Sequence, residues 1–71
     1  MRLVLPDVLR TALAATGPLD EELVRIAVDR WHRARRAVNV LPFGEPARRL
    51  AARIAQVARA ERAAGVKVRN L

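Results

Sequence analysis

The sequence predicts a mainly α-helical fold of three short helices in one small domain. Apolar residues recur at the spacing of an amphipathic helix in three segments of the chain. Proline and glycine gather at the boundaries of these segments, where they end helices. A chain of 71 residues suffices for one domain, 1–71, which we divide into a strand-helix-helix unit over 1–38 and a helix-and-tail extension over 39–71.

The N-terminal residues predict a short extended segment, a possible β-strand, followed by a first helix over 7–15. Residues 1–5 are partly β-branched and are closed by Pro6, and proline disfavours helix in the residue before it. Asp7 suits the start of the helix, and Gly17 and Pro18 mark its end.

A second helix is predicted over 20–38. Asp20 is a good N-cap, acidic residues follow it in the first turn, and arginines crowd the far end, where the helix dipole favours cations. Leu23, Ala27 and Trp31 lie on one apolar stripe, so we expect them in the core, with Trp31 as its anchor.

A third helix is predicted over 46–64, with Pro46 in the first position and Gly65 as the stop. Leu50, Ile54 and Val57 form its expected core face. Residues 66–71 alternate apolar and polar side chains, so this extended tail either pairs as a strand or frays.

Two charged residues interrupt the apolar faces of the long helices. Arg30 projects into the apolar arc of the second helix, and Glu61 does the same on the third. If the two helices pack together, the two groups can form a buried, hydrogen-bonded pair, because burial of either one alone is costly. The alternative is that Arg30 extends its guanidinium to water over its alkyl stem.

The strongest functional signal is a cationic flank on the third helix. The net charge is +7, from 14 basic and 7 acidic residues, and such an excess attracts polyanions. Five arginines project to one broad sector opposite the apolar face, which suits DNA binding as well as it suits a solvated surface. These expected nucleic-acid-binding residues are Arg48, Arg49, Arg53, Arg59 and Arg62.

Composition argues against several classes of function. The chain has no cysteine and one histidine, His32, so we expect neither a metal site nor a disulfide. It also lacks serine and tyrosine, and no oriented nucleophile or base can be assembled, so we expect no enzyme and no cofactor. No apolar run approaches the roughly 20 residues that cross a membrane, and residues 1–5 do not resemble a signal peptide. We expect a cytoplasmic protein without membrane association.

Residues 2–31 resemble the ribbon-helix-helix family of DNA-binding regulators and antitoxins. The likeness lies in the run Arg2-Leu3-Val4-Leu5-Pro6-Asp7, in Thr16-Gly17, and in the run from Glu22 to Trp31. The resemblance implies a strand from each of two subunits, joined as a ribbon in the major groove, with Arg2 and Val4 facing bases. It also implies burial of Leu3, Leu5, Val24, Ala27, Val28 and Trp31. The segment from Asn39 onward has no counterpart in the minimal family fold, and in antitoxins of this kind such an extension binds the toxin.

Two functions are therefore expected from the sequence. The first is a small dimeric DNA-binding transcriptional regulator, since much of the apolar content is alanine and the thin core of Leu, Ile and Val that remains gains from dimerisation. The second is a helical adaptor or structural subunit, for example of a phage particle or a toxin-antitoxin complex, that docks on an acidic protein surface. A protein partner would then bind through residues 39–71.

Overall fold

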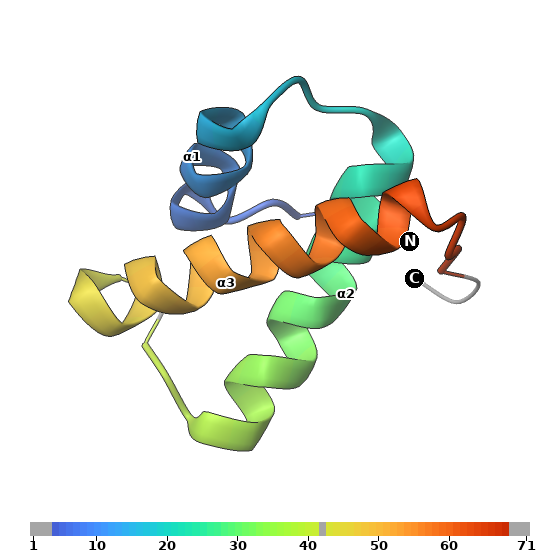
Figure 1. Cartoon of the computed structure of the whole chain (residues 1–71). Helices are drawn as coiled ribbons and strands as arrows, with labels where there is room; N and C mark the ends of the chain where they lie inside the picture. Colours follow the sequence, from blue (N-terminus) through green and yellow to red (C-terminus); the bar gives the residue numbers. More distant parts are fainter. Residues whose placement is uncertain (1–3, 42, 69–71) are drawn as a thin grey trace.

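The computed structural model describes residues 4–41 and 43–68, which form three helices: α1 (Asp7–Thr16), α2 (Glu21–Val38) and α3 (Gly44–Ala63). The mainly helical prediction is confirmed. α3 lies against both other helices, with α1 along one side and α2 crossing the other (Figure 1). Residues 4–6 and 66–68 are neither helix nor strand, and the rest of the predicted N-terminal segment and tail lies outside the described residues.

Backbone and side-chain caps set the ends of α1 and α2. The Pro6 carbonyl accepts hydrogen bonds from the first turn of α1, and Gly17, with φ 146°, ends that helix in a conformation that other residues rarely adopt. Asp20 caps α2 as predicted, since its carboxylate accepts the Leu23 N–H at 2.8 Å. Asn39 closes α2 in the left-handed conformation.

α3 begins two residues earlier than the predicted start at residue 46. Gly44, Glu45 and Pro46 occupy its first three positions, so the proline is not the first helical residue. Proline is tolerated throughout the first turn because the N–H groups there have no acceptor within the helix. At the other end the backbone N–H of Val66 donates to the Glu61 carbonyl, with Gly65 at φ 82°.

The core forms where α3 meets α1 and α2. Leu23, Ala27, Trp31 and Ile54 are buried in it, together with Leu9 and Leu13 from α1. The face of α3 at the centre differs from the expected one, since alanine side chains fill it and Leu50 and Val57 are only partly buried. Because the alanine side chain is small, α1 and α2 can both pack close to the backbone of α3. The buried alanines of α3 are Ala47, Ala51, Ala55 and Ala58.

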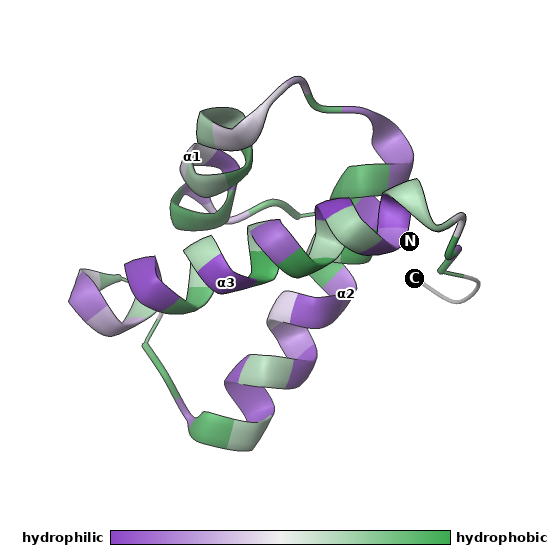
Figure 2. Cartoon of the chain, in the orientation of Figure 1, coloured by the Kyte–Doolittle hydropathy of each residue, from purple (hydrophilic) through white to green (hydrophobic). Residues whose placement is uncertain are grey.

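The last residue of α2 and the connection to α3 expose large apolar side chains. Val38, Leu41 and Phe43 are 59%, 63% and 66% exposed. Figure 2 shows this connection in hydrophobic colours over most of its described length. Arg35 holds the connection against α2, because its guanidinium donates to the Val40 carbonyl at 2.9 Å and lies 6.0 Å from the centre of the Trp31 ring.

Candidate functional site

The excess positive charge is concentrated in one part of the chain. Residues 30–53 hold seven arginines and one glutamate, a net charge of +6. The remaining residues hold seven basic and six acidic side chains, a net charge of +1. We call residues 30–53 the basic hairpin; it comprises the second half of α2, the connection, and the first half of α3 (Figure 1). The charge therefore lies on an α2–α3 feature and not along the whole of α3.

Two arginines of the basic hairpin line one groove between α2 and α3, and two more share a helix face with them. Arg33 of α2 and Arg53 of α3 line the same groove, of about 350 Å³, whose apolar lining includes Leu50. Arg36 follows Arg33 by one turn of α2, and Arg49 precedes Arg53 by one turn of α3, so each pair shares a helix face. We call these four residues the arginine band.

The arginine band is open to solvent and weakly neutralised. Arg33 contacts Asp29 at 3.2 Å and its side chain is 66% exposed. Arg49 contacts Glu45 at 3.4 Å and is 80% exposed. Within residues 4–41 and 43–68, no ion pair or side-chain hydrogen bond engages the other two band members, Arg36 and Arg53. A surface of this kind can approach a string of phosphates with little loss of internal contacts.

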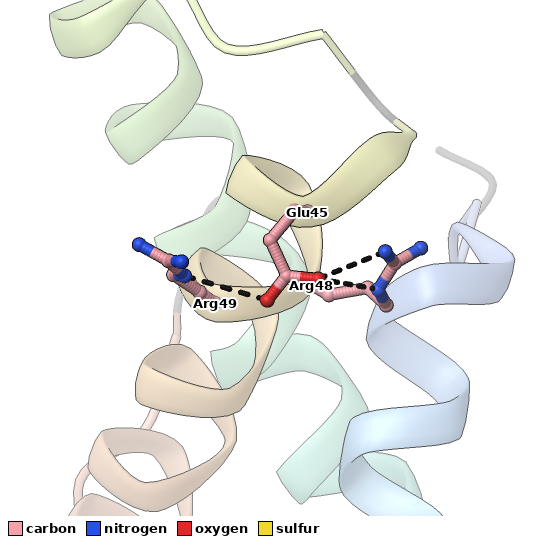
Figure 3. Close-up of polar contacts among 3 residues, drawn as sticks. All are labelled: Glu45, Arg48 and Arg49. Carbon is pink, nitrogen blue, oxygen red and sulfur yellow. Dashed lines mark hydrogen bonds and ion pairs between the residues drawn. The ribbon is translucent and has the colours of Figure 1, made fainter.

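Glu45 connects two of the sequence-predicted arginines. Figure 3 shows its carboxylate between Arg48 and Arg49, which extend to opposite sides of α3. One oxygen accepts from Arg48 Nη2 at 2.9 Å, and the other accepts from Arg49 Nε at 3.4 Å. The hydrogen bonds from Arg48 and then Arg49 hold the pKa of Glu45 below its ordinary value. One carboxylate thus faces two cations, which leaves a net positive charge at this turn.

Two of the predicted binding residues, Arg59 and Arg62, belong to the fold instead. Arg59 Nε donates to Thr16 Oγ1 at 2.6 Å, and its Nη2 donates to the Leu13 and Pro18 carbonyls at 2.9 and 3.0 Å. Arg62 Nε lies 3.2 Å from the Asp20 carboxylate that caps α2. The five arginines therefore do not form one surface. The sequence could not show this, because their acceptors lie far away along the chain, at the end of α1 and in the α1–α2 connection.

The Arg30–Glu61 pair forms, but it is not buried. The guanidinium makes a two-pronged contact with the carboxylate, with Nε donating to Oε1 at 2.8 Å and Nη2 donating to Oε2. The two side chains are 44% and 23% exposed, so the expectation of a buried pair is wrong. The long arginine stem carries its charged end to the edge of the α2–α3 contact. The hydrogen bond from Arg30 lowers the pKa of Glu61.

Arg2, the remaining sequence-predicted contact, lies outside the described residues. The helical pattern of α3 does not point to Arg33 and Arg36 of the band, because they lie on α2; the distribution of charge along the chain does point to them. Trp31 is fully buried, so its ring cannot stack on a ligand.

Comparison with protein-family models, with characterised proteins and with solved structures gave no match. No described helix has both the length and the apolar composition needed to cross a membrane. In the described ranges no three histidine or acidic side chains gather in a way that could hold a metal ion.

Proposed function

We propose that the chain is a small DNA-binding protein that contacts the phosphate backbone with its arginine band. The observation that supports this proposal is the placement of six of the seven excess positive charges on the basic hairpin. Guanidinium groups donate two hydrogen bonds to phosphate oxygens, and they are more weakly hydrated than ammonium groups. Contacts of this type give affinity without reading base sequence.

In this proposal the protein acts in the cytoplasm as a dimeric transcriptional regulator. The resemblance to ribbon-helix-helix proteins would add Arg2 as a base-reading residue, with the N-terminal segments of two copies pairing as a ribbon. The arginine band would then fix the protein on the backbone beside that ribbon. Light scattering at several concentrations tests the dimer, since a constant mass of one chain would remove the ribbon from the proposal.

Salt dependence of binding tests the use of the arginine band. If its four arginines each neutralise one phosphate, the log–log slope of affinity for duplex DNA against salt is roughly −3.6, from about −0.9 per phosphate. The double substitution Arg49→Ala with Arg53→Ala should reduce the slope to roughly −1.8. Fluorescence anisotropy of labelled duplex DNA measures both values.

Arg10→Ala is the matched control for this experiment. Arg10 is an exposed arginine of α1, outside the basic hairpin, so its removal lowers the net charge without touching the band. We expect its slope to stay within about half a unit of the unsubstituted value. A control whose slope changes by half as much as that of the double variant, one charge against two, would show that binding follows net charge and would remove the band as the contact surface.

A second candidate is a helical adaptor that docks on an acidic protein surface. The exposed Val38, Leu41 and Phe43 favour it, because large exposed apolar side chains beside arginines are typical of protein interfaces. Indifference to DNA at low salt would support this candidate over DNA binding.

A further inference from the structure

A second groove lies on the other side of α3, between α1 and the first turns of α3. It encloses about 640 Å³, within the range of roughly 300–1,000 Å³ that small-molecule sites occupy. Its lining is mostly apolar and also includes the polar side chains of Asp7, Thr11 and Arg48. We call it the Phe43 groove after its largest side chain. The apolar residues that line it are Val8, Ala12, Ala15, Phe43 and Ala52.

We propose that the Phe43 groove receives an unpaired nucleobase of a single-stranded nucleic acid, stacked on the Phe43 ring. This inference rests on the DNA-binding function proposed above and narrows its ligand to a strand whose base faces are accessible. Phosphate contacts alone would not use this apolar groove, whereas a stacked base would.

Phe43 has the exposure that base stacking requires. The chain contains one phenylalanine, one tryptophan and no tyrosine, and Trp31 is fully buried while Phe43 is 66% exposed. An exposed aromatic ring in water offers an apolar face, and the apolar part of a nucleic acid is the face of its bases. Paired duplex bases stack on each other and hide those faces, whereas a single strand presents them.

The charged side chains that line the groove are Asp7 and Arg48, and the excess positive charge of the basic hairpin lies beside them. Arg48 lines the groove, and its side chain is 63% exposed despite its contact with Glu45. Arg49 extends to the opposite side of α3 from Arg48 (Figure 3), towards the side of its band neighbour Arg53. A strand crossing the first turns of α3 could therefore place a base in the groove, one phosphate on Arg48 and the next phosphates on the band.

The same charge opposes a second copy of the chain in this groove. Phe43, Gly44 and Arg48 belong to the basic hairpin, so docking two copies here would bring two segments of net charge +6 together. Juxtaposed like charges disfavour an interface. A polyanion is favoured for the same reason.

Binding of labelled oligodeoxythymidylate and of a duplex of equal length, each measured by fluorescence anisotropy at low salt, tests the inference. We expect Phe43→Ala to weaken single-strand binding about 5- to 150-fold, which corresponds to the loss of one stacked base. Duplex binding should change less than about twofold, since phosphate contacts remain. Phe43→Trp should restore single-strand binding, because it restores a ring.

Leu41→Ala is the matched control, because Leu41 is also a strongly exposed apolar residue of the connection but does not line the groove. Its single-strand affinity should match that of the unsubstituted chain. Circular dichroism of each variant establishes that the helices are retained.

The outcomes separate the inference from the proposed function. If the chain binds both duplex and single-stranded DNA and Phe43→Ala changes neither affinity, the stacked base is overturned and the DNA-binding proposal stands. Failure of the chain to bind either probe at low salt overturns the DNA-binding proposal, and the base site with it. An effect of Phe43→Ala on molecular mass in light scattering, without an effect on single-strand affinity, assigns the groove to a second copy and also overturns the inference.

Discussion

The two halves of α3 carry the same kind of side chain in opposite circumstances. In the first half, Arg49 and Arg53 extend into solvent, with one weak contact to Glu45 between them. In the second half, Arg59 is held by two oxygens of α1 and one of the α1–α2 connection, and Arg62 by the cap of α2. Whether an arginine is free to bind a ligand depends on the acceptors that other segments of the fold bring to it. Its position on the helical wheel does not determine this.

The largest expected effect is the loss of stability on Arg59→Ala. This substitution leaves the Leu13 and Pro18 carbonyls and the Thr16 hydroxyl without their charged donor, which costs about 2 kcal/mol. For a domain of this size the midpoint of thermal unfolding should fall by roughly 8–16 °C. Circular dichroism at rising temperature measures the change.

Arg53→Ala is the matched control, one and a half turns away on the same helix. It removes no hydrogen bond, so we expect its stability to stay within about 0.5 kcal/mol of the unsubstituted chain. Its effect should appear in the salt slope of DNA binding instead. Equal losses of stability from the two substitutions would contradict the division of α3 into a solvent-facing and a structural half.

A smaller effect is expected from Glu61→Gln, which removes the charge that holds Arg30 across the α2–α3 contact. A two-pronged pair at this partial exposure contributes about 1 kcal/mol. The pKa of Glu61 is lowered in the folded chain, so its contribution is present above the ordinary value of 4.5 and is lost as the pH falls through the folded pKa. Urea unfolding at neutral pH and at successively lower pH measures it.

The difference in stability between Glu61→Gln and the unsubstituted chain should therefore shrink below about pH 4.5. Asp20 and Glu45 also have lowered pKa values, the first because of the Leu23 N–H and the second because of Arg48, so both proteins lose stability in acid. The comparison of the two proteins isolates the part that belongs to Glu61. A difference that persists unchanged into acid would show that the substitution acts through packing.

The smallest effect is expected at Glu45, in the solvent-facing half. Glu45→Gln removes the acidic charge between Arg48 and Arg49, so DNA affinity should rise by about two- to fivefold at low salt, and the gain should fade as salt screens it. Anisotropy titrations at two salt concentrations measure it. A fall in affinity would mean that Glu45 is needed to position the arginines.

The sequence predicted the local features of the fold well, because their causes lie within a few residues. Asp20 as a cap and Gly17 as a stop act on the nearest turn, and the apolar stripe of α2 includes the buried Trp31. Helical periodicity also brought Arg30 and Glu61 to facing sides of α2 and α3. The exposure of that pair depends on how far the two helices overlap, and the periodicity of the sequence does not predict this overlap.

The candidate site was harder to predict, because it depends on contacts between distant segments. Arg59 shares a helix flank with Arg48 in sequence, yet its partners lie more than forty residues away, at Thr16 and Leu13. Arg33 of α2 joins Arg53 only because the two helices form the walls of one groove. The exposure of Phe43 follows from its place before α3, outside any helix.

The alanine face of α3 has a consequence for how the chain could be altered. Alanine has no side-chain torsion to freeze, so this part of the interior forms with little loss of rotamer freedom. The helices are correspondingly near each other, and a leucine at position 51 or 55 would force them apart instead of filling a void. Attempts to strengthen this protein by adding bulk at its centre should fail, and the residues that can be enlarged are the half-buried ones at its margins, such as Leu50 and Val57.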